Sequence, residues 1–181
     1  KTAALAGHAM AANMLGRCYE HGWGTPACDK TATHWYARAA EAGLDWGQYN
    51  YATSLQLGRG VPADRARAFA LFRAAAAQGH AKSINVLGGF YEDGWEVGAD
   101  LAMALRCYLR AAEGGDFRGQ FNAARLLALA GRLDEAHDWM QAVPHTATPA
   151  FLAKAHDFLA GHPDARLRAL AGALETTSPC C

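Results

Sequence analysis

The sequence predicts an all-α solenoid of stacked helix–turn–helix repeats, with about ten helices. Residues of one kind recur at steps of 36 along the chain, which is the mark of an internal repeat. Within each unit, apolar residues recur every three or four positions, the period of a helix. Glycines mark the predicted helix ends, in the columns Gly7, Gly43, Gly79 and Gly115, and Gly22, Gly58 and Gly94.

The first helix of each unit is predicted from its apolar spacing and from the glycine that follows it. In the third unit this helix carries Gly88 and Tyr91 and ends at Gly94. Gly88 falls inside the helix, where glycine costs roughly 0.5–1 kcal/mol relative to alanine. Gly16 and Ala52 hold the same position in earlier units. A position kept small at such a cost indicates close contact with a neighbouring helix.

A turn and a capping residue precede the second helix of each unit. Asp64 and Asp100 stand directly before an apolar periodic run, where an aspartate can accept hydrogen bonds from the first helical turn. Cys28 has this position in the first unit. Each second helix then carries one large aromatic residue in a shared column, namely Tyr36, Phe72 or Tyr108. Because one helix pair cannot bury both of its faces, the units must stack.

Several motifs occur in more than one unit. They are Ala12-Asn13-Met14-Leu15-Gly16 with Tyr19 and Gly22, Gly47-Gln48-Tyr49-Asn50 with Gly58-Arg59-Gly60-Val61-Pro62, and Leu87-Gly88 with Tyr91 and Gly94. Together they resemble the Sel1-like repeat, a relative of the tetratricopeptide repeat. The resemblance covers about residues 1–143. It implies a right-handed α-solenoid of bacterial type whose usual role is to bind other proteins.

The repeat columns divide the chain into repeats and an atypical end. Residues 1–143 are predicted to hold a partial first unit ending at Gly7, repeats near 9–43, 45–79 and 81–115, and a degenerate unit over 117–143. Residues 144–181 are expected to form a degenerate helix pair, over 149–160 and 163–175, that caps the solenoid before a loose tail. Since residues 1–7 match the end of a second helix, we expect an upstream half-repeat outside this sequence, and whether a leader sequence was removed stays open.

Composition narrows the classes of partner. Lys+Arg and Asp+Glu both number 17, and this zero formal net charge argues against nucleic acid, whose binders are usually basic. No apolar stretch approaches the ~20 residues of a membrane-spanning helix, so no membrane insertion is predicted. The five cysteines are irregularly spaced. We therefore expect a reducing, cytoplasmic location, with a periplasmic or secreted one left open.

Two histidines and two cysteines near the start of the chain superficially suggest a zinc site, namely Cys18, His21, Cys28 and His34. Their spacing lacks the paired ligands of closed zinc sites, so no metal or other cofactor is predicted. A Cys18–Cys28 disulfide stays open for an oxidising compartment. His8 and His80 share a turn position, which favours a structural role. No catalytic motif is visible, and the chain is not expected to be an enzyme.

Candidate binding residues come from the first helices, which line the concave surface in related helical repeats. Positions spaced i, i+3, i+7 and i+10 lie along one helix face, and Trp, Tyr and Arg are enriched at binding hot spots. The partner-binding candidates are Trp46, Tyr49, Lys82, Arg118, Phe121 and Arg125. For Tyr49 and Phe121, a plain packing role is an equal alternative.

These observations predict a non-catalytic scaffold or adaptor that holds a protein or peptide partner in its concave groove. Two alternatives stay open. In the first, the chain is a structural segment of a larger multi-domain protein. In the second, which has less support, it is an enzyme that uses the groove as a pocket. Neither the partner's identity nor the oligomeric state follows from the sequence.

Overall fold

The computed structural model describes residues 2–174, with side chains from residue 7 onward, and this part of the chain contains helices and no strand. The α-helices are α1 (Thr2–His21), α2 (Asp29–Glu41), α3 (Asp45–Leu57), α4 (Arg65–Ala77), α5 (Ala81–Asp93), α6 (Leu101–Glu113), α7 (Phe117–Leu129), α8 (Leu133–Ala142), α9 (Pro149–Ala160) and α10 (Ala165–Arg168). Two short 3₁₀ helices are η1 (Val143–His145) and η2 (Ala171–Leu174). The predicted all-α class is confirmed. None of the described helices has the length and apolar character needed to cross a membrane.

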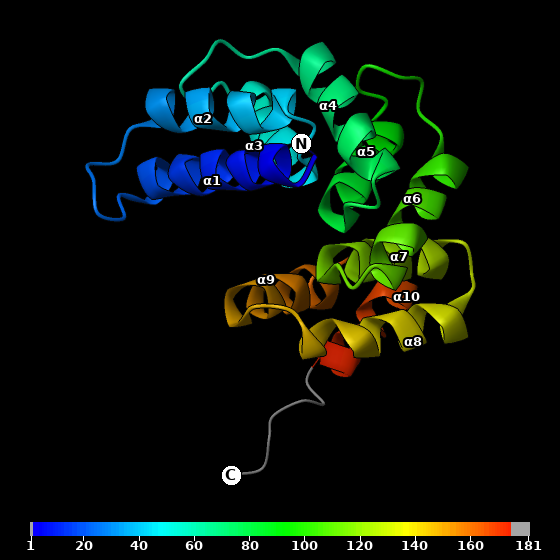
Figure 1. Ribbon diagram of the computed structural model, residues 1–181. Coiled ribbons are helices and arrows are strands. Elements are labelled where there is room, and N and C mark those ends of the chain that lie inside the picture. Colours follow the sequence, from blue (N-terminus) through cyan, green and yellow to red (C-terminus); the bar gives the residue numbers. More distant parts are fainter. Residues whose placement is uncertain (1, 175–181) are drawn as a thin grey trace.

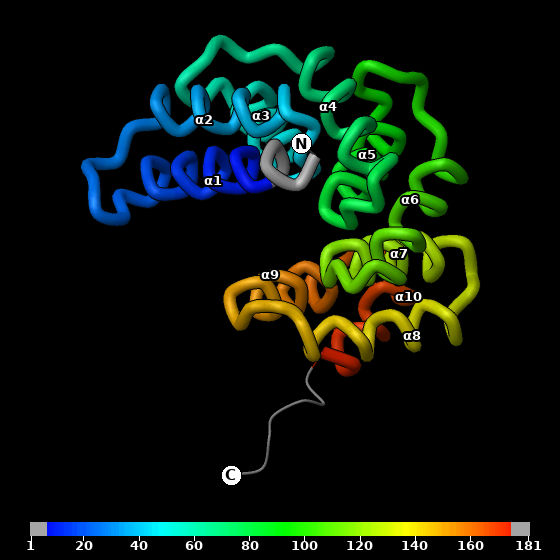
Figure 2. The backbone as a smooth tube through the Cα atoms, in the orientation of Figure 1, coloured from blue at the N-terminus to red at the C-terminus, as the bar shows by residue number. Residues whose placement is uncertain are grey.

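Consecutive helices pack against one another and form an arc. Each of α1 to α8 contacts the next helix along the chain. Figures 1 and 2 show α1 and α3 on one arm of the arc, α7 and α9 on the other, and α4 to α6 at the bend. The first helices also contact each other across units, as α1 does with α3 and α5 with α7. The arc therefore has an inner side, bordered mainly by first helices and by α9.

The helix ends follow the residues that predicted them. Gly58 and Gly94 adopt the left-handed conformation, with φ of 68° and 73°, directly after α3 and α5. Asp64 and Asp100 cap α4 and α6, and each accepts a hydrogen bond of 2.9 Å from a backbone N–H three residues later. Cys28 is the corresponding residue before α2 but makes no such capping bond. The boundaries of these helices are thus set by local residue chemistry.

The small residues inside first helices make room for the aromatic residue of the second helix. A Cβ atom built on Gly16 would lie 2.5 Å from the ring of Tyr36, and one on Gly88 would lie 2.6 Å from Cδ1 of Tyr108. Both tyrosines are 2% exposed. A side chain at either glycine would therefore collide with a buried ring, which explains why glycine is tolerated within these helices.

A hydrogen bond between two asparagines joins first helices at two places in the solenoid, two units apart. The side-chain amide of Asn50 donates to Asn13 at 2.8 Å, and that of Asn122 donates to Asn85 at 3.0 Å. Each bond joins the first helices of adjacent units, α1 to α3 and α5 to α7. This asparagine pair therefore repeats after two units, whereas the packing of the helices repeats at each unit.

The break expected after Gly7 is not formed, because α1 continues through it from Thr2 to His21. Gly43 and Gly79, in the same column, have positive φ, whereas Gly7 does not. Nothing lies within 4 Å of the place where a side chain of Gly7 would be. The same is true at Gly43 and Gly79, so the open space does not decide where a helix ends, and backbone hydrogen bonding continues through Gly7. His8 accordingly lies within a helix and not at a turn.

The C-terminal helix pair differs from the prediction in its second half. The first half is α9, but the helix expected over 163–175 is divided into α10 and η2. The tighter 3₁₀ turn keeps Leu167, Leu170 and Leu174 buried against one core cluster. The loose tail expected at residues 178–181 lies outside the described residues.

Candidate partner-binding face

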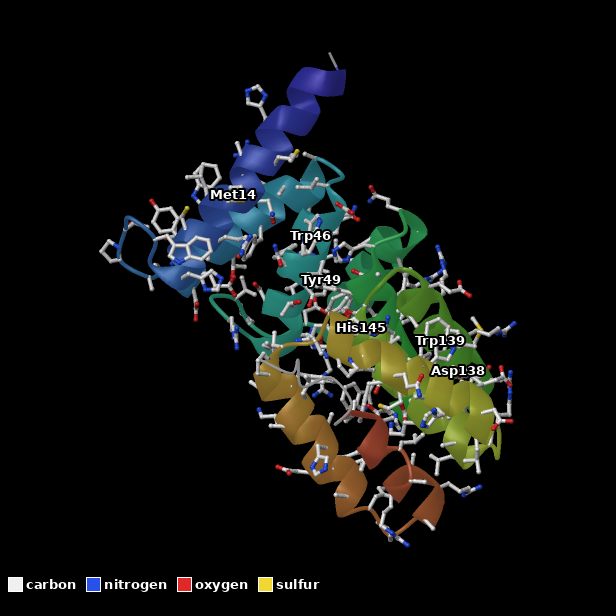
Figure 3. The ribbon with its side chains drawn as sticks, turned by 90° about the horizontal axis from the view of Figure 1, so that it is seen from below. Met14, Trp46, Tyr49, Asp138, Trp139 and His145 are labelled. Atoms are coloured by element: carbon white, nitrogen blue, oxygen red, sulfur yellow. The ribbon has the colours of Figure 1, made fainter. Side chains whose placement is uncertain are left out.

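A hollow of about 760 Å³ lies on the inner side of the arc, between α1, α3 and the start of α5. Its walls include Met10, Met14, Arg17, Trp46, Tyr49 and Lys82. Figure 3 shows Met14 of α1 and Trp46 and Tyr49 of α3 on the same side of the molecule. Met10 is 61% exposed and Trp46 is 42% exposed. The hollow thus presents large apolar side chains to solvent from a concave surface, as ligand sites commonly do.

Trp46 is held in place by a buried histidine beneath it. The rings of Trp46 and His80 meet edge to face with centroids 4.5 Å apart, and Tyr49 lies 5.0 Å from the same imidazole. His80 caps α5 by accepting a hydrogen bond from the backbone N–H of Ser83. On the other side, Nζ of Lys82 lies 4.9 Å from the centroid of the Trp46 ring. The indole therefore has a defined position although its outer face is exposed.

The stability that His80 contributes beneath this hollow depends on pH, because its imidazole can be protonated. Burial lowers the pKa of His80, the charge of Asp45 opposes this shift, and Lys82 adds to it. An unfolded chain protonates histidine near pH 6.5, whereas the folded protein resists this protonation. The stability that neutral His80 gives is therefore present above pH 6.5 and is lost as the pH falls through and below that value.

We expect native protein to lose more stability than His80→Asn when the pH is lowered from about 7.5 to about 5, because asparagine retains a capping side chain but does not titrate. Urea unfolding at both pH values measures the difference. The native protein's other histidines titrate in both proteins, so their contribution cancels. An equal loss in both proteins would show that the folded state protonates His80 freely.

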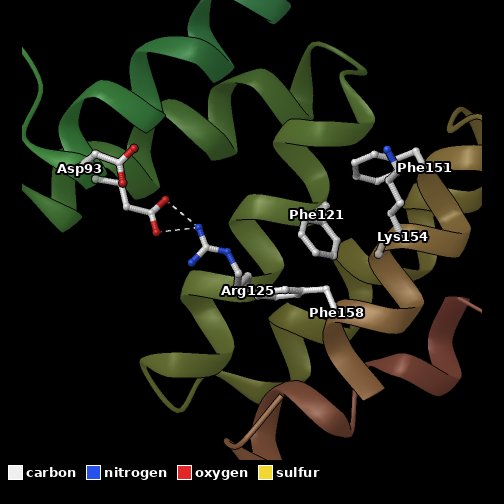
Figure 4. Close-up of a pocket in the computed structure, with 8 residues that line it drawn as sticks. Asp93, Phe121, Arg125, Phe151, Lys154 and Phe158 are labelled. Carbon is white, nitrogen blue, oxygen red and sulfur yellow. Dashed lines mark hydrogen bonds and ion pairs between the residues drawn. The ribbon is translucent and has the colours of Figure 1, made fainter. Parts of the chain in front are cut away.

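A second hollow of about 470 Å³ lies between the end of α5, α7 and α9. Its walls include Asp93, Phe121, Arg125, Phe151, Lys154 and Phe158, which Figure 4 shows converging from three helices. Phe121 lies 5.6 Å from Phe151 and 6.1 Å from Phe158, measured between ring centroids. Phe121 therefore packs α7 against α9 and also lines the hollow, and its role in partner binding stays a prediction.

Arg125 bridges two units. Its Nη2 lies 2.6 and 2.7 Å from the two carboxylate oxygens of Glu92 on α5, as the dashed lines in Figure 4 mark. Glu92 also accepts a hydrogen bond of 2.8 Å from the hydroxyl of Tyr108. The Arg125 and Glu92 side chains are 17% and 20% exposed. Nη2 of Arg125 is thus engaged inside the protein, and a role of this residue in partner binding stays a prediction.

Arg118 lies between the two hollows. Its guanidinium carbon is 4.5 Å from the ring centroid of Phe117 and 6.0 Å from that of Phe151, which lines the second hollow. Burial raises the pKa of Tyr49, which lines the first hollow, and the charge of Arg118 opposes that shift. The structure thus brings Trp46, Tyr49 and Lys82 together in one hollow, places Phe121 and Arg125 in another, and sets Arg118 between them.

The contribution of α9 was missed by sequence reasoning, which treated residues 144–181 as a cap. Phe151, Lys154 and Phe158 follow the i, i+3, i+7 spacing of one helix face, and this signal could have identified them. What the spacing does not show is that α9 turns toward the inner side of the arc (Figure 1).

The residues that superficially suggest a zinc site make other contacts in the structure. Among the described residues, no three His, Cys, Asp or Glu side chains are grouped to hold a metal ion. Cys18, Cys28 and Cys107 carry free thiols. His21 stacks on Trp23 with ring centroids 4.7 Å apart. The two hollows are therefore the features of the described chain that are best suited to contact with a partner.

Comparison with known proteins places these features in a family. A family model described as Sel1 repeat matches residues 9–44, 47–80 and 81–116. Chitin synthase regulatory factor 3 of Schizosaccharomyces pombe is 37% identical over 120 residues, which are 64% of this chain and 13% of that protein. The chain thus matches a small part of this curated relative.

Two solved structures share the fold. The Sel1 repeat protein from Oxalobacter formigenes aligns with a TM-score of 0.72 and 27% identity, over 94% of this chain and 71% of that one. A protective antigen present in uropathogenic Escherichia coli strains, which displays an SLR fold, aligns with a TM-score of 0.74 and 25% identity, over 93% of this chain and 37% of that one. These matches confirm the predicted solenoid of Sel1-like repeats.

Proposed function

We propose that this chain, which belongs to the Sel1 repeat family, is a non-catalytic scaffold or adaptor that holds a protein or peptide partner on the inner face of its solenoid. Sel1 repeat proteins generally mediate protein–protein interactions, and the fungal relative is by name a regulatory factor. The observation that carries the proposal is the exposed, fixed indole of Trp46 in a concave surface.

A fixed aromatic side chain is an effective anchor for a partner. Binding hot spots are enriched in tryptophan, and they lie in pockets that lose water when the partner arrives. Because His80 and Lys82 already position Trp46, little side-chain entropy is lost when a partner covers it. Two hollows along one face suit an extended or helical segment that places one apolar side chain in each.

We expect Trp46→Ala to weaken partner binding by roughly thirtyfold, the effect of losing a hot spot of about 2 kcal/mol. A partner is first isolated by pull-down from the native organism and identified by mass spectrometry. Its affinity for each variant is then measured by calorimetry, and circular dichroism checks that the helices are intact.

Trp95→Ala is the matched control for this experiment. Trp95 is 40% exposed, close to the value for Trp46, and it lines neither hollow. Arg73→Ala, on the second helix α4, is a further control. If Trp95→Ala or Arg73→Ala weakens binding and Trp46→Ala does not, the partner binds another surface and the proposal for the inner face is wrong.

A further inference from the structure

Four carboxylates of the inner face already accept hydrogen bonds within the protein. Glu20 accepts from the hydroxyl of Tyr36, and Glu92 accepts from a tyrosine hydroxyl and a guanidinium. Asp45 accepts from the backbone N–H of Trp46 at 2.7 Å. Asp116, which is 5% exposed, accepts from the N–H of Gly119. Asp93, which lines the second hollow, is exposed and has no such contact with the residues that the structure describes.

Unlike Arg125, which is paired with Glu92, four other cations of the same face have no such partner in the described chain. Arg17, Lys82, Arg118 and Lys154 make no ion pair and no side-chain hydrogen bond within the part of the chain that the structure describes. The first three lie over the rings of Trp23, Trp46 and Phe117, at 5.1, 4.9 and 4.5 Å. A cation over a ring gains electrostatic attraction but keeps N–H donors without an acceptor. The inner face therefore offers donors whose natural complement is a carboxylate.

Lys82 lines the first hollow on the side of α5, and Arg118 lies between the two hollows. They occupy the same column in the first turns of α5 and α7. Lys82 lies over Trp46 of the first hollow, and Arg118 lies near Phe151 of the second. A chain that anchors one side chain in each hollow must pass between them along these two residues.

We propose that the partner segment is an acidic peptide with aromatic or large aliphatic residues, whose carboxylates bind Lys82 and Arg118 while its apolar side chains enter the two hollows. This inference rests on the proposed function and specifies the partner's chemistry. The negative charge of Asp116 interacts with both cations. The residue is buried, however, and its Oδ2 accepts the hydrogen bond that caps α7. It therefore lowers the local positive charge but forms no ion pair with either cation among the described residues.

A protein segment fits this face better than a nucleic acid. Glu20 and Asp45 line the first hollow and Asp93 lines the second, among the cations. A phosphate backbone carries a charge at every nucleotide and would meet these carboxylates. A peptide can place apolar residues opposite them and its carboxylates opposite Lys82 and Arg118. The chain's formal net charge of zero agrees with this choice.

The test is a selection from a random peptide library displayed on phage, with the whole native chain and the double variant Lys82→Glu/Arg118→Glu as targets. We expect the native chain to enrich peptides that combine Asp or Glu with aromatic residues. The leading peptide, made synthetically, should bind the double variant at least tenfold more weakly and should bind the native chain less well at higher salt. Arg73→Glu/Arg106→Glu, a double charge reversal on second helices, should bind the peptide as the native chain does. Circular dichroism verifies each variant.

The outcomes separate this inference from the proposed function. Failure to enrich any peptide whose binding depends on Trp46 overturns the proposed function, and this inference with it. Peptides that depend on Trp46 but carry no acidic excess, or that bind both double variants equally, overturn the acidic partner alone. Tighter binding of a single-stranded oligonucleotide than of the selected peptide would also overturn it, in favour of a nucleic-acid partner.

Discussion

Replacing Gly88 by valine is expected to lower the free energy of unfolding by about 3 kcal/mol, at the upper end of the usual cost of overpacking. A Cβ atom at this position would collide with Cδ1, Cε1 and Cζ of Tyr108. The ring cannot move aside easily, because Tyr108 is 2% exposed and its hydroxyl donates to Glu92. Because the colliding atom is Cβ itself, rotation about χ1 cannot relieve the collision, and the two methyl groups of valine add further bulk.

The adjacent glycine provides a matched control. A Cβ on Gly89 would meet only the hydroxyl oxygen of Tyr108, at an ordinary contact distance of 3.8 Å. Gly89→Ala should therefore stabilise the chain by roughly 0.5–1 kcal/mol, since alanine is the better helix former. Urea unfolding of both variants, with Lys82→Ala as a surface control, measures the difference. Changes of the same sign at Gly88 and Gly89 would mean that helix propensity governs this position and that the contact with Tyr108 does not.

The parts of the fold that were predictable depend on residues close in sequence. The left-handed glycines after α3 and α5 and the aspartate caps of α4 and α6 act within a few residues, so a repeated column is enough to identify them. Gly7 shows where this reasoning fails. Its residue type permits a turn but does not enforce one, and the space around it is as open as at Gly43 and Gly79, so the shared column alone does not determine whether the helix ends.

In the candidate site too, some features follow from the repeat pattern and others do not. Trp46, Tyr49 and Lys82 were predicted together because they lie on first helices, whose inner face follows from the repeat. The bridge from Arg125 to Glu92 joins different columns of two units, so comparison within columns does not reveal it. The same holds for the bond from Asn50 to Asn13. Such diagonal contacts depend on the angle between units, which the period alone does not determine.

Removing the carboxylate of Glu92 is expected to cost about 2 kcal/mol of stability. Breaking a fully buried ion pair by deleting one partner costs about 3–5 kcal/mol, and we reduce that value because these side chains retain some exposure. Glu92→Ala leaves the Arg125 guanidinium and the Tyr108 hydroxyl without their acceptor in a partly desolvated site.

Glu20→Ala is the matched control for this change, because Glu20 accepts from Tyr36 as Glu92 does from Tyr108. Its side chain is 32% exposed and its nearest guanidinium, that of Arg59, is 3.9 Å away. The loss there should be about 1 kcal/mol, mostly from the tyrosine hydrogen bond. Equal losses at Glu20 and Glu92, measured by urea unfolding, would show that the Arg125 pair is solvated and adds little. If instead the Glu92 loss is larger and shrinks in Glu92→Met/Arg125→Met, the unpaired charge is its cause. In that case a binding defect of Arg125→Ala would mix lost stability with lost contact, which makes Trp46 the cleaner probe of the inner face.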